Sequence, residues 1–165
     1  MVIEIPKNAM EKPTTAISSS SLTVAATGIR RFTVDGYSVT KELAVVGDYY
    51  QSEQFTVSGH DWAIRYYPTT TTIGSWCEFY LVMLSRPPAS GGAVGVTFAC
   101  TPLDRRGEPS AGEERRLSQV FADGGGQETV WPISFRKEVM QSDEYVNGDC
   151  FAVQCTVSVL KKALC

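Results

Sequence analysis

The chain has 165 residues, of which 43% are hydrophobic and 20% charged, and its formal net charge is -3. This length suits one domain with a packed core, and the composition is ordinary for a globular protein. The basic residues are scattered, so we expect neither nucleic acid nor an anionic membrane as a partner. No run of about 20 apolar residues is present, so no membrane-spanning helix is expected.

The first 27 residues differ in character from the rest of the chain. They are mostly polar, with prolines at positions 6 and 13 and a serine run at 18–21. This composition predicts a flexible N-terminal tail over residues 1–27, followed by a folded domain over 28–162 and a short tail at 163–165. The first residues lack the basic-then-apolar order of a secretory signal, so a cytoplasmic or nuclear location is expected.

Cysteine usage favours reduced thiols. An odd number of cysteines at irregular spacing, without a signal peptide, predicts mostly buried thiols and no disulfide framework. There is no C-x-x-C motif and the chain has a single histidine, so no metal site and no cofactor are expected. The cysteines are Cys77, Cys100, Cys150, Cys155 and Cys165.

After the tail, short runs rich in β-branched and aromatic residues alternate with turn residues. Ordered structure is expected to begin within 28–39. Further strands are predicted at 53–59, 61–68, 75–85, 93–103, 115–126, 128–135 and 149–162. Such a series of about seven or eight short strands, with almost no helix, predicts an all-β antiparallel sandwich or barrel.

Three of these segments carry more detailed predictions. The run 75–85 is too continuously apolar for an exposed face, which indicates a central strand. Residues 135–146 are the one helical candidate. The last strand alternates cleanly, which predicts one inward face. Its members are Phe151, Val153, Cys155, Val157 and Val159.

The only histidine, His60, precedes Asp61 within "FTVSGHDWAIRYYP" (55–68). The strands 53–59 and 61–68 are separated by Gly59-His60, which is typical of a tight hairpin. Alternation within 61–68 places Trp62, Ile64 and Tyr66 on one face, with Arg65 and Tyr67 on the other. We interpret His60 as a turn residue, because no neighbouring nucleophile completes a catalytic triad.

Other chemistry-bearing motifs are weak. There is no G-x-S-x-G, and "ADGGGQ" (122–127) lacks the lysine and the following helix of a phosphate-binding loop. The carboxylates are single or lie in loop clusters, so no pair spaced for acid–base chemistry is identified. No catalytic residue is predicted, and the chain is not expected to be an enzyme.

Four segments occur together in an order that resembles the MATH (meprin and TRAF homology) domain, in the version found in plant MATH-BTB (BTB/POZ-MATH) proteins. They are "FTVDGYS" (32–38), "GDYYQSEQFTVSGHDWAIRYYP" (47–68), "EFYLVMLS" (78–85) and "GDCFAVQCTVSVL" (148–160). The resemblance covers roughly residues 22–160 and implies an eight-stranded antiparallel TRAF-like β-sandwich.

The resemblance also implies a function. Such domains bind short Ser/Thr-rich peptides of substrate proteins in a shallow groove, and a following BTB domain recruits a cullin, so the whole protein is a substrate adaptor of a ubiquitin ligase. This chain ends at Cys165 without a BTB domain, so a cullin would be reached only through a module absent here. Either it is one domain of a longer protein, or it is a MATH-only interaction or self-association module. No heptads precede the domain, so a monomer is expected.

The resemblance maps the peptide groove onto particular residues. The groove aromatic of the "EFYLVML" strand falls on Tyr80, and the aromatic ahead of Phe98 is replaced by Val96. A Tyr-x-Phe pair of the family matches "SQVFADG" loosely, as Ser118 with Val120 or as Val120 with Phe121. The Trp-Gly-Phe turn is matched by "WPI", although a different gap would move Trp131 to the place of that Phe. The predicted peptide-binding residues are therefore Tyr80, Val96, Phe98, Val120, Phe121, Trp131 and Ile133.

Overall fold

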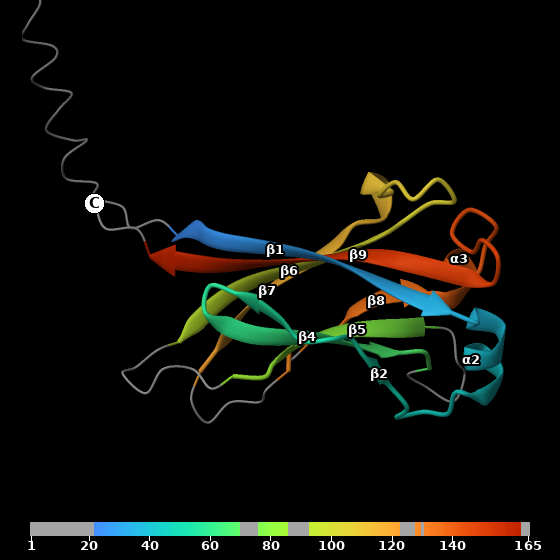
Figure 1. The fold of residues 1–165 in the computed structure, drawn as a ribbon, viewed down its shortest axis with the longest axis horizontal. Helices are drawn as coiled ribbons and strands as arrows, with labels where there is room; N and C mark the ends of the chain where they lie inside the picture. The colour runs from blue at the N-terminus through green and yellow to red at the C-terminus, as the bar shows by residue number, and fades with distance from the viewer. Residues whose placement is uncertain (1–21, 70–75, 86–92, 123–127, 130, 163–165) are drawn as a thin grey trace, which may run out of the picture.

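A computed structural model describes residues 22–69, 76–85, 93–122, 128–129 and 131–162. Two antiparallel sheets face each other across a single core (Figure 1). The all-β antiparallel sandwich predicted from the sequence is therefore confirmed. Most of the expected N-terminal tail, the C-terminal tail and the glycine-rich segment 123–127 lie outside the described residues.

One sheet has four strands in the order β1-β9-β6-β7, and β1 and β7 are its edges. The other has five strands in the order β2-β4-β5-β8, with β3 also paired to β4. The bounds of the first sheet are β1 (Leu22–Asp35), β9 (Cys150–Lys162), β6 (Val94–Pro102) and β7 (Arg115–Phe121). Those of the second are β2 (Tyr50–Gln51), β3 (Phe55–Val57), β4 (His60–Tyr67), β5 (Trp76–Met83) and β8 (Ile133–Arg136).

The described residues form nine strands rather than the eight expected. The difference arises at one sheet edge, where the partner of β4 is interrupted at Ser52 and so divides into the short strands β2 and β3. The N-terminal strand is also longer than expected, because β1 begins at Leu22, before the predicted domain start at residue 28. The central position predicted for the 75–85 strand is confirmed, since β5 lies between β4 and β8.

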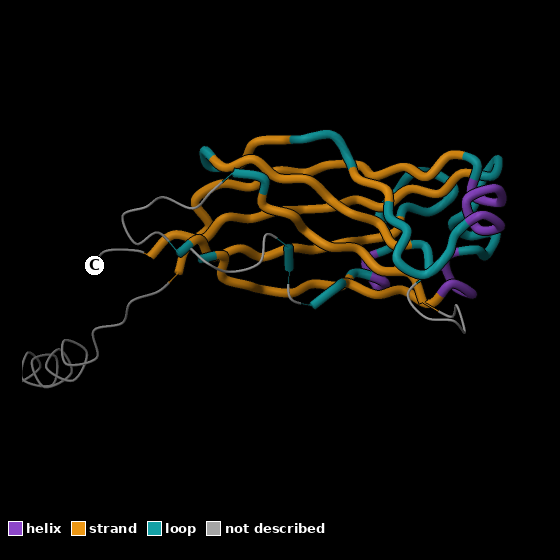
Figure 2. Tube along the Cα trace, turned by 90° about the horizontal axis from the view of Figure 1, so that it is seen from below, coloured by secondary structure: helices purple, strands orange, loops and turns teal. Residues whose placement is uncertain are grey.

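Two short α-helices lie at one end of the sandwich, opposite the end where β1 begins and β9 ends (Figures 1 and 2). The helix expected within 135–146 is confirmed only as α3 (Lys137–Met140), and a 3-10 turn covers Ala111–Glu113. The helix α2 (Tyr37–Leu43) was not predicted. No helix among the described residues has the length and apolar character needed to cross a bilayer.

The helix α2 depends on contacts with a distant part of the chain. Gly36, with φ 71°, adopts the left-handed conformation that glycine favours and separates β1 from α2. The backbone N–H and hydroxyl of Ser38 then donate to the two carboxylate oxygens of Asp149, at 2.9 and 2.7 Å. These bonds satisfy the helix N-terminus from a residue that follows α3, a partner that local sequence patterns do not reveal.

The core follows from the alternation of side chains along each strand. The inward face predicted for β9 is confirmed, since all five of its members are at most 5% exposed. On β4 the inward series Trp62, Ile64 and Tyr66 is likewise buried, at no more than 1% exposed. Of the four described cysteines, three are buried and Cys150 is partly exposed, and all are free thiols.

The β3–β4 hairpin is confirmed, but its turn lies one residue earlier than expected. Ser58 and Gly59 both have positive φ, at 53° and 76°, which is the geometry of a two-residue hairpin turn. His60 therefore begins β4 opposite Val57, and its ring contacts the ring of Trp62 edge-on at 6.2 Å. The hydroxyl of Thr56 on β3 donates to the carboxylate of Asp61 on β4 at 2.8 Å, so this hydrogen bond links the two strands of the hairpin.

Gly28 provides a test of how β1 meets β3. A Cβ at this position would lie 2.5 Å from Cγ2 of the buried Val57, a stiff β-branched side chain. Gly28→Ala should lower the free energy of unfolding, measured by chemical denaturation, by about 1–3 kcal/mol. In a Val57→Ala background, the same substitution should cost clearly less.

The matched control is Gly95→Ala, also in a strand, where the new Cβ would meet only Leu160 Cβ at an ordinary 3.7 Å. That variant should be neutral or more stable by roughly 0.5–1 kcal/mol, because alanine loses less backbone entropy than glycine. Equal effects of the two substitutions would contradict the close approach of β1 and β3.

Buried thiols predict how stability depends on alkaline pH. Burial raises the pKa of the Cys77 thiol from its ordinary 9.0 to about 12. Because the thiol ionises more easily in the unfolded chain, the free energy of unfolding is unaffected by this group below pH 9 and falls as the pH rises towards 12. Urea denaturation at pH 7.5, 9 and 10.5 should show falling stability, with a shallower fall in Cys77→Ala. Identical pH profiles of the two proteins would refute this contribution.

Candidate functional site

The outer face of the five-stranded sheet carries a group of tyrosine, arginine and glutamate side chains. Because β4 buries Trp62, Ile64 and Tyr66, its intervening residues Arg65 and Tyr67 point to the opposite side. In the register with β5, Arg65 lies opposite Tyr80 and Tyr67 lies opposite Glu78. Four half-buried side chains of two central strands thus share one exterior surface.

Three tyrosines form a continuous row on this surface. The ring of Tyr67 contacts Tyr49 on one side, with centroids 5.4 Å apart, and Tyr80 on the other, at 5.2 Å. The Arg65 guanidinium lies 4.5 Å from the centre of the Tyr49 ring. Tilted and edge-on ring contacts of this kind hold aromatic side chains in fixed orientations at a solvent-accessible surface. We call this surface the tyrosine face, formed by Tyr49, Arg65, Tyr67, Glu78, Tyr80 and Glu128.

Charged groups frame the row of tyrosines. Arg65 donates from Nε to Gln51 Oε1 at 2.9 Å and from Nη1 to Glu128 Oε2 at 3.2 Å. The Tyr80 hydroxyl donates to Glu78 Oε1 at 3.4 Å. Arg65 and Glu128 are partly exposed, so this pair contributes little to stability and mainly fixes the orientation of the guanidinium.

Partial burial shifts the pKa of two groups of the face, Tyr80 and Glu78. The pKa of Tyr80 is raised to about 12, mainly by burial and secondly by the nearby Glu78 carboxylate. The phenol is therefore a neutral hydrogen-bonding group at physiological pH. Burial also raises the pKa of Glu78, while its hydrogen bonds with Tyr80 and Ser134 act in the opposite direction.

A short segment connects the tyrosine face to the edge strand β7. The N–H of Thr129 donates to the Leu81 carbonyl at 2.8 Å, and Glu128 forms an isolated bridge with Val82. Gln119 on β7 donates from Nε2 to the Glu128 carbonyl at 3.4 Å. Residues 128–129 therefore extend the pairing of β5 and tie it to the other sheet.

The structure divides the seven predicted peptide-binding residues into core and surface. Four are no more than 3% exposed and belong to the hydrophobic core: Val96, Phe98, Phe121 and Ile133. Phe121, for example, contacts the Trp62 ring edge-on at 5.4 Å. In this conformation these side chains offer no surface to a ligand, and their described contacts are those of packing residues.

The other three predicted residues, Tyr80, Val120 and Trp131, are accessible, and Tyr80 and Val120 lie on different sheets. Tyr80 belongs to the tyrosine face, whereas alternation along β7 places Ser118 and Val120 on the outer face of the four-stranded sheet. Val120 is 62% exposed and Trp131, between β7 and β8, is 74% exposed. Peptide contact by any of the seven stays a prediction.

Sequence reasoning placed Arg65 and Tyr67 on a common outward face but assigned them no function. It missed Tyr49 and Glu128 altogether, because these residues join the face from segments outside β4 and β5. The available signal was the alternation of "DWAIRYYP", in which Arg65 and Tyr67 are a charged and an aromatic residue on the face opposite Trp62, Ile64 and Tyr66.

Comparison with known proteins connects this architecture to a family. Residues 30–157 match the family model described as "MATH domain". The chain is similar to BTB/POZ and MATH domain-containing protein 3 of Arabidopsis thaliana, at 24% identity over 155 residues. It is also similar to proteins 4 and 6 of the same series and organism, each at 27% identity, over 154 and 161 residues.

These alignments cover most of this chain but a minor part of each relative. They include 88%, 90% and 92% of this chain, against 37%, 32% and 37% of proteins 3, 4 and 6, respectively. The chain thus spans about a third of the length of the curated relatives that it matches.

The tyrosine face should tolerate substitution without loss of the fold. Arg65→Ala removes a half-exposed side chain, so the free energy of unfolding should fall by about 1 kcal/mol or less. Trp62→Ala empties a site that is 0% exposed and should cost about 3–5 kcal/mol. Urea denaturation followed by circular dichroism measures both values. A loss above about 2 kcal/mol for Arg65→Ala would mean that the face is primarily structural.

Proposed function

Because the chain belongs to the MATH domain family, a family of protein-interaction modules, we propose that it binds short peptide segments of partner proteins through the tyrosine face. The observation that carries this proposal is the row of Tyr49, Tyr67 and Tyr80, anchored by Tyr67 and Tyr80 on the central strands β4 and β5 and accompanied by the Arg65–Glu128 ion pair. Sites built on strands are positioned more accurately than sites on loops.

The chemistry of the face suits an extended, partly polar peptide. Tyrosine rings offer large contact areas with little loss of side-chain entropy, and their hydroxyls both donate and accept hydrogen bonds. The carboxylates of Glu78 and Glu128 can accept from serine or threonine hydroxyls, while Arg65 can donate to a peptide carbonyl. Short Ser/Thr-rich segments are therefore the proposed ligands. Their affinity should be modest, because a short peptide buries little area and is ordered on binding.

We further propose that peptide recognition serves substrate selection for protein ubiquitination. The names of the relatives combine a BTB/POZ with a MATH domain, and this chain aligns with about a third of their length. In such an arrangement this domain would hold the substrate peptide, and a BTB domain would contact a cullin. The domain is proposed to act as a monomer that presents one tyrosine face.

Peptide binding can be measured by fluorescence polarisation with a library of labelled Ser/Thr-rich peptides. The wild-type domain should bind a subset of the library, and Tyr80→Ala should weaken that binding by about tenfold or more, since aromatic anchors dominate small interfaces. Trp131→Ala tests whether the exposed tryptophan of the β7–β8 connection belongs to the same site.

The matched control is Trp76→Ala. Trp76 is an exposed aromatic residue on β5, four residues from Tyr80 and therefore roughly 13 Å along the strand. This variant should bind like the wild type. Circular dichroism confirms that each variant is folded. If no peptide binds, or if folded Tyr80→Ala binds as well as the wild type, the tyrosine face is not the peptide site.

A further inference from the structure

A groove lies between the two sheets, on the side of the sandwich where β1 is the edge strand. It has a volume of about 550 Å³, within the range of ligand-binding pockets. One wall is the backbone of β1 over residues 30–35, and the other is the segment 50–55. The apolar floor is formed by Phe32, Val34, Phe55 and Ile64.

Ser52 explains why the sandwich is open here. Its N–H donates to the Ile64 carbonyl at 2.8 Å, and its hydroxyl accepts from the Ile64 N–H at 2.9 Å. One residue thus satisfies both backbone groups of Ile64, and the described pairing with β4 resumes only at Phe55. Glu53 and Gln54 are exposed and lie outside the ladder, which leaves the space between this segment and β1 unfilled.

The wall formed by β1 is an unpaired sheet edge. Among the described residues β1 forms a ladder only with β9, so half of its backbone groups point away from the sheet. Beyond the groove the gap closes, because Gly28 packs directly against Val57. The free part of the edge is about six residues, or roughly 20 Å, long, which matches a short extended peptide.

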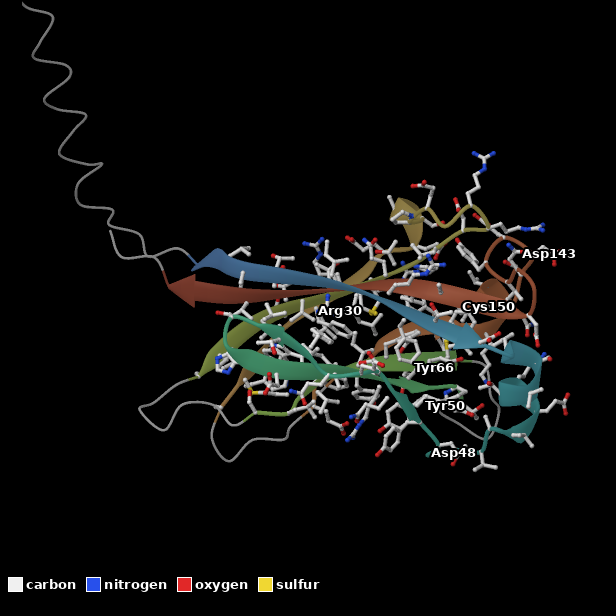
Figure 3. All side chains as sticks on the ribbon, viewed as in Figure 1. Arg30, Asp48, Tyr50, Tyr66, Asp143 and Cys150 are labelled. Carbon is white, nitrogen blue, oxygen red and sulfur yellow. The ribbon has the colours of Figure 1, made fainter. Side chains whose placement is uncertain are left out.

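Arg30 supplies a charge at the closed end of this groove. Its guanidinium lies 5.1 Å from the centre of the Phe55 ring, and Nη1 donates to the Ile29 carbonyl at 3.1 Å. No carboxylate pairs with Arg30 or with the neighbouring Arg31 in the part of the chain that the structure describes. Figure 3 labels Arg30 on β1 and Tyr50 on the segment that forms the opposite wall. A positioned guanidinium with free N–H donors is suited to a carboxylate.

We propose that this groove binds an extended peptide segment that pairs with the β1 edge and places an Asp or Glu side chain against Arg30. Apolar residues on the same side of the peptide cover Phe32 and Val34. The groove also contains two carboxylates, Asp35 and Glu53. Asp35 is five residues along β1 from Arg30, or roughly 16 Å, so the β1 wall is positive at the Arg30 end and negative at the Asp35 end. This polarity specifies which end of the peptide carries the acid.

A probe peptide for the groove can be designed from the geometry of an antiparallel strand pair. In the acetylated and amidated hexapeptide Gln-Val-Gln-Val-Gln-Glu, the two valines and the glutamate lie on one face. Antiparallel pairing with residues 30–35 places the glutamate opposite Arg30 and the valines opposite Phe32 and Val34. A second peptide with lysine in place of glutamate tests charge, and the reversed sequence tests direction.

The experiment is a titration of the uniformly ¹⁵N-labelled 165-residue chain with each peptide, followed by amide chemical shifts. We expect the glutamate peptide to shift the amide signals of residues 30–35 and 50–55 in the wild-type chain. Its affinity for the Arg30→Gln variant should be about tenfold lower than for the wild type. Arg116→Gln removes an exposed arginine from β7, at the opposite edge of the same sheet, and should bind like the wild type. The lysine peptide should bind at least tenfold more weakly than the glutamate peptide.

The proposal would be overturned if no amide shifts appeared up to about 2 mM peptide, which is about the weakest binding that would matter. Equal binding of the glutamate and lysine peptides, or unchanged binding by folded Arg30→Gln, would also overturn it. Shifts confined to Tyr67 and Tyr80 would place the peptide on the tyrosine face instead. Concentration-dependent shifts of β1 without peptide would indicate that a second copy of the chain covers this edge. Since the probe contains no serine or threonine and the variants differ, failure here leaves the proposed function of the tyrosine face unaffected.

Discussion

The structure depends on a cluster of aromatic rings between the two sheets. The Tyr66 and Phe79 rings are stacked at 5.0 Å, and Phe32 contacts both of them at 5.8 Å. Because each ring buries a large apolar area and prefers particular angles to its neighbours, the cluster fixes how the sheets face each other. It joins both sheets and α2 through Phe32, Tyr37, Tyr66, Phe79, Phe135 and Phe151.

This packing also determines what the outer surface can present. A shift of β4 by one residue would turn Tyr66 outward and bury Arg65 and Tyr67, which the core excludes on energetic grounds. The tyrosine face is therefore a consequence of the inward series, and its residues need to contribute little to stability themselves. The outward side chains can therefore bind a ligand, while the inward side chains next to them stabilise the fold.

The two proposed binding surfaces use different features of the sandwich. The tyrosine face relies on outward side chains of the central strands, whereas the β1 groove relies on an unpaired edge and on the interruption at Ser52. Gln51 lies between them, because it accepts a hydrogen bond from Arg65 and also lines the groove. Strand β2 is thus the structural boundary shared by both surfaces.

Sequence patterns predicted the all-β class, most strand positions and the inward faces of β4 and β9, because alternation is a local property of each strand. The sequence also contained the MATH resemblance, which the family match confirmed. Only the tertiary structure showed that Val96, Phe98, Phe121 and Ile133 are buried, since that depends on how the sheets pack. It likewise brought Glu128 to Arg65, 63 residues away, and Asp149 to Ser38, 111 residues away. Such contacts follow from strand order and from the closure of long connections, which no local pattern encodes.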